Sequence, residues 1–401
     1  MSEYRFLLPP GPLAPYASGW WAFLIERGHT EATARRRLTQ LCQLSRWLEA
    51  EGFPLAHFDE ALAARFALAR RARGRATWSS PANSALLLKY LRSVGAVAPR
   101  PAPVGAFEDL LAAYSTYLAR ERGLATKTVA AHVVSARAIC NGLAGGPEGL
   151  KDLRPEHITA LVMTFSAAAS ASTTKHMVGS LSSFLRYLHL TGFTARPLAA
   201  AVPKLKGRRP GPQPPSLTEA EVARLLGSCR AERPVGRRDF AILALLSRLG
   251  LRPCEVAALC LSDIDWRHGE VLIRGKGSRY ERLPLPWEAG EAVAGYLAQG
   301  RHQGPDGCRA VFLRCRAPFT PLGLAGVQAV VVRASERAGL GKIGPRRLRK
   351  YVATAVHKGG FPLAGVGQVL RHTGAKATAV YVDLDEAVLA GLARPWPGNG
   401  R

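Results

Sequence analysis

One stretch organises this chain: Leu249-Gly250-Leu251-Arg252-Pro253-Cys254-Glu255-Val256. Between its arginine and Tyr381, the side chains that could do chemistry follow in the order Arg, Lys, Arg, His, Tyr. This order suits a tyrosine hydroxyl that attacks a phosphodiester inside a ring of cations, because cations stabilise the charge that builds on the phosphate. The stretch therefore predicts a phosphoryl-transfer site in the C-terminal half.

Four further elements follow the first arginine. Lys276 lies between two glycines, and the second box reads Arg346-Arg347-Leu348-Arg349. The third box reads Leu370-Arg371-His372, and Tyr381 follows nine residues after the histidine. Each element is common by itself, and only their order and spacing make a specific pattern.

In this order the elements resemble the boxes of the tyrosine recombinase (phage integrase) family. The resemblance covers residues 216–395, and it extends with less specific motifs to residues 106–200, which are similar to the family's core-binding helical domain. It implies an enzyme that cuts and rejoins DNA through a 3′-phosphotyrosyl intermediate, without ATP or metal. It also implies a homotetramer that acts on two duplexes of double-stranded DNA.

Each predicted catalytic side chain has a chemical reason. Arg252 and Arg349 lie in apolar segments that read as helical, and their guanidinium groups can hold phosphate oxygens bidentately, which a lysine cannot do. Tyr381 is the predicted nucleophile, and it needs nearby cations because the free pKa of tyrosine is about 10. Lys276 is predicted to protonate the leaving 5′-oxygen, and His372 to donate a hydrogen bond to the phosphate.

Two positions depart from the family pattern. The second box usually begins with histidine, where this chain has Arg346, and arginine cannot act as a general base at neutral pH. We still expect Arg346 to contact the phosphate. Arg371 stands where the third box usually has glycine, and we expect it to add positive charge near the site. Glu255, three residues after Arg252, is expected to orient the site rather than to act as a base.

The composition points to a polyanionic partner. The 401 residues carry 55 Lys and Arg against 29 Asp and Glu, a net charge of +26, which exceeds what solubility requires. No stretch approaches the roughly 20 apolar residues that cross a bilayer, the N-terminus does not read as a secretory signal, and the seven cysteines contain no Cys-x-x-Cys pair. We therefore expect a cytoplasmic DNA-binding protein with reduced thiols and no cofactor or metal.

Two helical stretches precede the catalytic part and repeat one another. Residues 1–98 and 106–200 both show amphipathic helical periodicity. The segment Phe184–Gly192 is similar to Leu87–Gly95, at an offset of 97 residues. The match predicts two copies of one helical module, both binding DNA.

Proline-rich linkers are predicted at residues 95–105 and 199–215, because prolines stop helices and keep a chain extended. The second linker is also basic, so it either lies along a DNA backbone or is a spacer whose charges keep it soluble. Contacts to DNA phosphates are predicted for seven residues of the second module and this linker: Lys127, Lys175, Arg186, Lys204, Lys206, Arg208 and Arg209.

The catalytic part, residues 216–395, reads as α-rich with a small antiparallel sheet. Thr218–Glu221 has the spacing of a capping box at the start of a helix. Strands expected over Glu270–Ile273 and Tyr280–Leu285 place Lys276 at the tip of a β-hairpin.

The predicted fold class is therefore mainly α and multidomain, with two helical SAM-like DNA-binding modules followed by an α+β catalytic domain. The predicted function is a site-specific DNA recombinase or integrase, and the doubled module favours a mobile-element type. Two alternatives stay open. One is a topoisomerase or telomere-resolvase-like enzyme with the same chemistry. The other is a DNA-binding protein of the same fold with weakened catalysis, which Arg346 favours.

Overall fold

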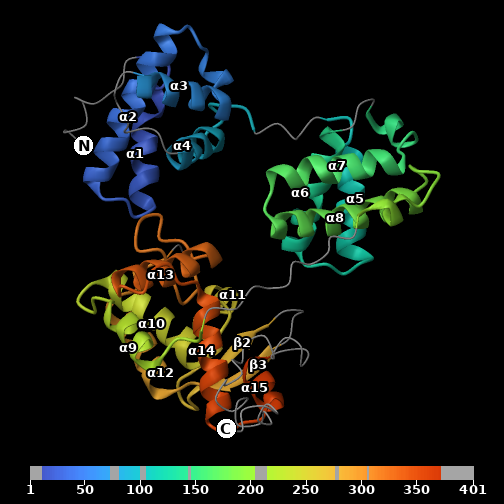
Figure 1. Ribbon diagram of the computed structural model, residues 1–401. Coiled ribbons are helices and arrows are strands. Elements are labelled where there is room, and N and C mark those ends of the chain that lie inside the picture. The colour runs from blue at the N-terminus through green and yellow to red at the C-terminus, as the bar shows by residue number, and fades with distance from the viewer. Residues whose placement is uncertain are drawn as a thin grey trace, which may run out of the picture. The chain divides into compact units, whose positions relative to one another are not determined.

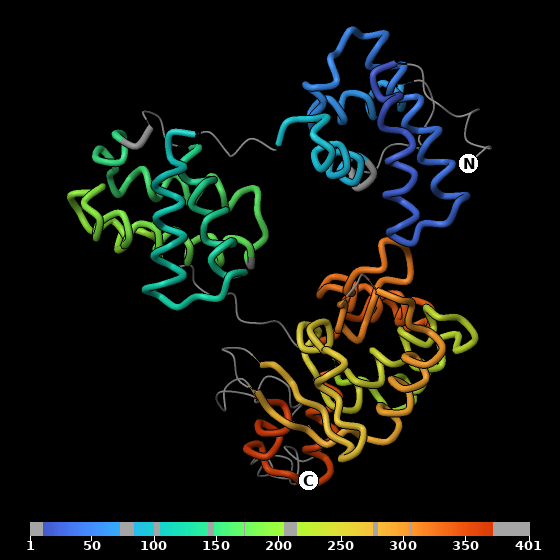
Figure 2. Tube along the Cα trace, turned by 180° about the vertical axis from the view of Figure 1, so that it is seen from behind, coloured from blue at the N-terminus to red at the C-terminus, as the bar shows by residue number. Residues whose placement is uncertain are grey.

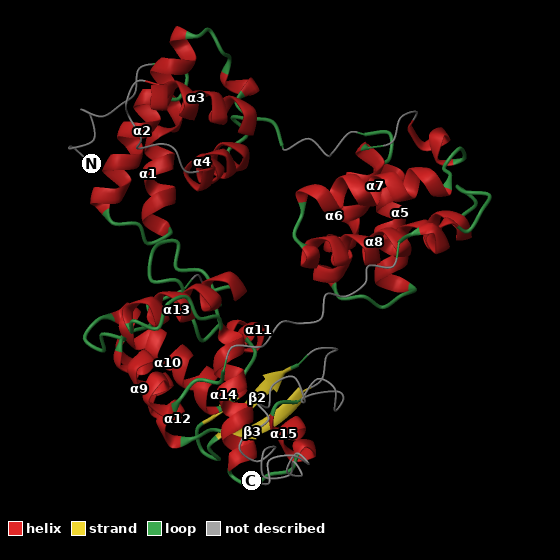
Figure 3. Ribbon diagram, in the orientation of Figure 1, coloured by secondary structure: helices red, strands yellow, loops and turns green. Residues whose placement is uncertain are grey.

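The computed structural model describes residues 11–72, 81–99, 105–142, 146–203, 215–275, 280–304 and 307–371. These residues form a mainly helical chain with one small sheet (Figures 1 and 3). The three large clusters of buried apolar side chains lie within residues 13–97, 107–202 and 217–348. We call the corresponding parts the first helical module (11–97), the second helical module (105–203) and the C-terminal domain (215–371). Among the described helices, none is both long and apolar enough to cross a membrane.

The first helical module consists of four α-helices and two short 3-10 turns. They are η2 Ala14–Tyr16, α1 Ala17–Glu26, α2 Glu31–Ala50, η3 Leu55–His57, α3 Glu60–Ala72 and α4 Pro81–Ser93. Helix α2 begins where it does because the Thr30 hydroxyl accepts a hydrogen bond from the Thr33 N–H, at 3.3 Å. Val97 packs into the core of this module, so the first residues of the predicted linker 95–105 belong to the module.

The second helical module, part of the compact unit 98–212, repeats this architecture (Figure 2). Its elements are α5 Glu108–Arg120, α6 Thr126–Asn141, η5 Gly146–Leu150, α7 Pro155–Ala168, α8 Ala171–Leu190 and η6 Leu198–Ala201. Val202 is buried in its core, so the predicted linker 199–215 begins with packed residues. The sequence missed this packing because a short apolar run before prolines has no helical period of its own.

The two modules share helix order and spacing. The starts of α2 and α6 lie 95 residues apart, as do the starts of α3 and α7, and the ends of α4 and α8 lie 97 residues apart. This spacing agrees with the internal repeat that the sequence predicts. Between the start of the second helix and the end of the fourth, the net offset therefore changes by only two residues.

The C-terminal domain packs helices around a central helix and adds a three-stranded sheet. Its elements are α9 Glu219–Gly227, α10 Pro234–Arg248, α11 Pro253–Ala258, η7 Leu261–Asp263, β1 Ile264–Asp265, β2 Glu270–Arg274, β3 Tyr280–Pro284, α12 Trp287–Gln299, α13 Leu324–Arg337, α14 Pro345–Lys358 and α15 Leu363–Val369. Helix α10 contacts α9, α12, α13 and α14. It is apolar on nearly every side, from Ala241 to Leu246, which suits a helix enclosed by others.

Two local predictions for this domain are confirmed. The Thr218 hydroxyl accepts from the Glu221 N–H at 3.2 Å, and the Glu221 carboxylate accepts from the Thr218 N–H at 2.8 Å. The second of these bonds lowers the pKa of the Glu221 carboxyl. Strands β2 and β3 pair antiparallel from Glu270–Pro284 to Arg274–Tyr280, as the hairpin prediction requires.

Candidate active site

Arg252 lies immediately before helix α11, not inside a helix as its apolar surroundings had suggested. It is the N-cap residue, with the extended backbone angles φ −76° and ψ 146°. The reason is Pro253, which fits the first position of a helix but keeps the residue before it out of helical geometry. Its side chain is 31% exposed, so it is held by the protein and still reaches solvent.

Glu255 fixes the position of Arg252. One carboxylate oxygen accepts from Nη1 of Arg252 at 2.7 Å, and the other accepts from the Arg252 backbone N–H at 2.7 Å. Glu255 is 3% exposed, so a charge-assisted hydrogen bond here is little screened by water. These contacts agree with the predicted orienting role of Glu255.

Arg349 connects the second box to the first and third boxes through hydrogen bonds. It lies in α14 and is buried, and its guanidinium donates to the carbonyl oxygens of Gly250 and Leu370. Arg252 in turn donates from Nη2 to the carbonyl oxygen of Arg371, at 3.0 Å. The two arginines, 97 residues apart in sequence, therefore meet at the same short segment, Leu370–Arg371.

Arg371 brings a positive charge near the site, as expected, and this charge is paired with a buried carboxylate. Its Nη2 donates to Glu255 at 3.0 Å, and its side chain is 4% exposed. Its φ is +54°, in the left-handed region that glycine adopts without steric cost, which explains why glycine suits this position. The sequence could not show the pairing, since Glu255 lies 116 residues earlier. One carboxylate is thus shared by the guanidinium groups of Arg252 and Arg371.

The two arginines at the start of α14 differ in their surroundings. Arg346 is exposed, one turn before Arg349. Arg347 instead donates from Nη2 to the carbonyl oxygen of Pro215, at 2.8 Å. Unpaired N–H groups and cations at a helix N-terminus favour an anion, so Arg346 is placed where a phosphate oxygen could bind. Lys350, beside Arg349, is buried as well, and nothing in the basic sequence pattern marked it.

Three of the predicted catalytic residues, Lys276, His372 and Tyr381, lie outside the described residues. Strand β2 ends at Arg274 and strand β3 begins at Tyr280, so the described pairing stops on either side of Lys276 in sequence. The described chain ends at Arg371, whose carbonyl oxygen accepts a hydrogen bond from Arg252. The histidine is the next residue in sequence.

The predicted DNA contacts fall into two groups. Lys127, Lys175 and Arg186 are all exposed on the second helical module. The four linker residues Lys204, Lys206, Arg208 and Arg209 lie outside the described residues.

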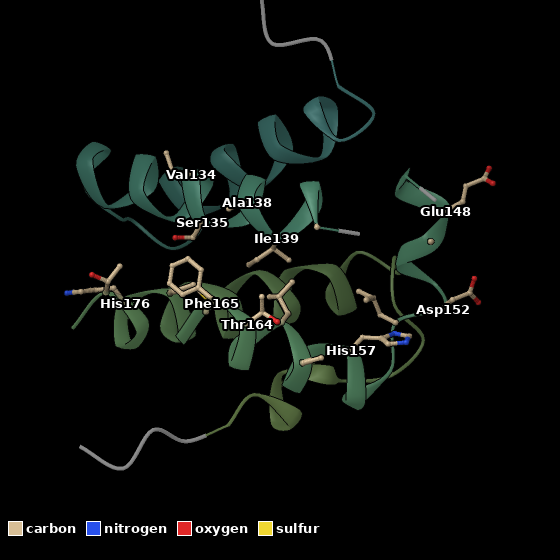
Figure 4. A pocket seen from close by; sticks show the side chains of 17 residues that line it. Val134, Ser135, Ala138, Ile139, Glu148, Asp152, His157, Thr164, Phe165 and His176 are labelled. Atoms are coloured by element: carbon tan, nitrogen blue, oxygen red, sulfur yellow. The ribbon is translucent and has the colours of Figure 1, made fainter. Parts of the chain in front are cut away.

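A cavity of about 1170 Å³ belongs to the second module. It is lined mainly by apolar side chains of α6, α7 and α8, among them Ile139, Leu161, Phe165 and Met177. Figure 4 shows Phe165 and Ile139 on the facing walls of this groove. No titratable group of the candidate catalytic site belongs to it.

Comparison with known proteins identifies the class that this fold and this arginine site define. Residues 215–387 match the model of the phage integrase family, and residues 111–192 match the phage integrase N-terminal SAM-like domain. Over 400 residues the chain is 33% identical to a putative integrase/recombinase of Sinorhizobium fredii, covering 98% of this chain and 97% of the relative. It is 31% identical over 294 residues to the tyrosine recombinase XerD of Mycobacterium tuberculosis, covering 68% and 91%.

The chain therefore belongs to the phage integrase family of tyrosine recombinases, and it is an enzyme of the DNA breaking and rejoining type. A solved lambda integrase dimer bound to a core site shares the fold, with a TM-score of 0.53, 20% identity, and coverage of 69% of this chain and 94% of that one. The first helical module lies outside both family-model matches.

Proposed function

We propose that this protein is a site-specific DNA recombinase of the mobile-element type, which cuts DNA through a 3′-phosphotyrosyl intermediate at Tyr381. The observation that carries the proposal is the convergence of Arg252 and Arg349 on the segment Leu370–Arg371. His372 follows that segment directly, so three boxes that are far apart in sequence are brought to one place.

The chemistry is a balanced transesterification. The Tyr381 oxygen attacks the phosphorus, the bond from phosphorus to the 5′-oxygen breaks, and Lys276 gives that oxygen a proton. The phenolic proton leaves to water, because Arg346 cannot accept it. In the second half, a 5′-hydroxyl from the partner strand attacks the phosphotyrosine and releases the tyrosine. The bond energy is kept, so no ATP is used.

The arginines stabilise the charge on the phosphate. A guanidinium has five N–H donors, and in the described contacts Arg252 uses one for Glu255 and one for the carbonyl of Arg371. Its remaining donors and its partial exposure support a phosphate contact. Arg349, Arg346 and His372 are assigned to the same phosphate oxygens.

The proposed partner is double-stranded DNA. Exchange between two duplexes needs four cut strands, so we propose a homotetramer on DNA. The exposed Lys127, Lys175 and Arg186, with the basic linker that follows, are the proposed phosphate contacts of the second module.

The test is covalent trapping on nicked suicide duplexes with a randomised central sequence. We expect the wild-type chain to give a protein–DNA adduct that survives a denaturing gel, and we expect Tyr381→Phe to reduce it below detection. Tyr117→Phe, partly buried against the core of the second module, is the matched control and should keep the adduct. An adduct that persists in Tyr381→Phe would sink the nucleophile assignment.

A DNA-binding protein with weakened catalysis is the second candidate, and the arginine at position 346 is what favours it. The same gel separates the two, since a duplex that is bound but never joined supports the second candidate. In that case Arg346→His should restore adduct formation, because histidine can accept the phenolic proton.

A further inference from the structure

The first helical module shares its internal packing with the second, although it lies outside both family-model matches. Each module contains three aromatic rings in mutual contact. The rings of the first module are Trp20, Phe23 and Tyr90, and those of the second are Tyr114, Tyr117 and Tyr187. The ring centroids are 5.1–5.5 Å apart in the first trio and 5.0–6.5 Å apart in the second. Equivalent rings are 94 or 97 residues apart in sequence, so the core positions correspond one to one.

The fourth helices also end in the same way. Gly95 and Gly192 have φ of +72° and +77°. The N–H after each glycine bonds back to a leucine carbonyl, from Ala96 to Leu91 at 2.9 Å and from Phe193 to Leu188 at 2.8 Å. This is the Schellman ending, and it fixes the register between α4 and α8 at 97 residues.

That register aligns a basic residue of the first module with a proposed DNA contact of the second. Lys89 on α4 is equivalent to Arg186 on α8, and both are exposed. On the second helix, Lys127 of α6 is equivalent to Ala32 of α2. Arg36 lies one turn further along α2, on the same exposed face, so its long side chain covers the same region.

The cations of the first module exceed its carboxylates. Its described residues include ten Lys and Arg against six Asp and Glu. Arg92 is neutralised by Glu60 at 3.0 Å, and Arg35 lies 3.9 Å from Glu31. Within the described ranges no ion pair joins Arg36 or Lys89 to a carboxylate. Burial and the charge of Arg36 lower the pKa of Arg37, as expected where neighbouring cations lack a counter-charge.

We infer that the first helical module is a second DNA-contacting module, which binds phosphates of duplex DNA through Arg36 and Lys89. The inference rests on the proposed function, in which the second module binds DNA through Arg186. Val97 and Phe107 are packed in the two separate cores and are ten residues apart, so the chain between them spans at most about 35 Å. That reach equals about ten base pairs, which lets both modules engage one duplex.

The test is the salt dependence of binding by the full chain to a random-sequence duplex of about 40 base pairs. The logarithm of the binding constant falls with the logarithm of salt concentration by about 0.9 per neutralised phosphate. We expect Arg36→Ala with Lys89→Ala to make this slope shallower by about 1.8. Arg92→Ala is the matched control for the single variant Lys89→Ala, on the same helix and with the same loss of one positive charge. It should leave the slope unchanged because Glu60 already neutralises Arg92.

The Arg186→Ala variant tests the second module in the same way, so the two modules can be compared. If Arg186→Ala makes the slope shallower and the Arg36 and Lys89 variant does not, the first module does not bind phosphates and the inference is overturned. If neither variant changes the slope, the proposed DNA contact of the second module fails as well. Circular dichroism of each variant checks that the modules remain folded, and a single Lys89→Ala variant replaces the double one if that does not fold.

Discussion

The first and second helical modules have the same helical architecture, but the surfaces between their second and third helices differ. In the first module Gln43 of α2 and Arg70 of α3 are hydrogen-bonded to each other across this surface. At the offset of 95 residues, the equivalent positions in the second module are Ala138 and Phe165. These residues line the apolar groove of about 1170 Å³ (Figure 4).

This difference separates the features that hold the helices together, which both modules share, from the surface features that vary between them. The ring trio and the glycine helix ends occur in both modules because they hold the helices in register. The surface between the second and third helices carries a polar bridge in one module and an open groove in the other, and the helix spacing is unchanged. The same spacing of the second and third helices is therefore compatible with either surface chemistry.

The largest expected effect concerns the ring trio. Tyr90→Ala and Tyr187→Ala should each destabilise their own module by about 3–5 kcal/mol, since each removes a buried aromatic ring. In urea unfolding of the full chain, the tryptophan fluorescence transition should move for Tyr90→Ala, because Trp20 packs 5.3 Å from that ring. Tyr187→Ala should move the circular dichroism transition instead, since residues 105–203 contain no tryptophan.

Conservative variants are the controls for this pair. Tyr90→Phe keeps the ring and loses only the hydrogen bond to the carbonyl of Tyr16, at 3.0 Å, which should cost about 1 kcal/mol. If Tyr187→Ala moves the fluorescence transition as far as Tyr90→Ala does, the two modules do not unfold independently. That result would contradict the view that each ring trio stabilises its own module.

A smaller loss of stability, equal in the two modules, is expected from changes at the C-terminal ends of α4 and α8. Gly95→Ala and Gly192→Ala should each cost about 1–2 kcal/mol, because an L-residue is strained at positive φ. No atom lies within 4 Å of an added Cβ at either site, so the cost is purely conformational. Faster hydrogen exchange of the last turn of α4 or α8 measures it. Gly179→Ala, in the interior of α8 and also with free space, is the control and should stabilise the helix by about 0.5–1 kcal/mol.

A loss of stability no larger than at the helix ends is expected from exchanging the surface residues. Ala138→Gln with Phe165→Arg should lower the free energy of unfolding by about 1–2 kcal/mol, because Ala138 is exposed and Phe165 is only partly buried against the core. The same change should weaken binding of an apolar fluorescent dye to the groove. The reverse exchange, Gln43→Ala with Arg70→Phe, should create dye binding in the first module. If dye binding is the same in all variants, the apolar groove does not distinguish the two modules.

Much of the candidate site could be predicted because its signals are local. The capping box at Thr218 and the pairing of β2 with β3 depend on residues within a few positions of each other. The orienting role of Glu255 follows from its place three residues after Arg252. Such features are set by hydrogen bonds inside one turn of chain, so spacing in the sequence is enough to find them.

The tertiary structure decided which cations are paired. Arg371 and Arg346 are both arginines of the predicted boxes, but Arg371 is paired with a glutamate 116 residues away, which Arg252 shares. Arg346 is exposed. Pairing depends on distance in space, which no local pattern contains. The same reason applies to Arg70 with Gln43, 27 residues apart.

By itself the sequence determined the helical periods, the repeat and the order of the arginine, lysine, histidine and tyrosine boxes, because each depends on neighbours along the chain. The convergence of Arg252 and Arg349 on Leu370–Arg371, the burial of Lys350 and the open groove of the second module came only from packing. They depend on which helices meet, and that is settled by the burial of whole apolar faces rather than by any single residue.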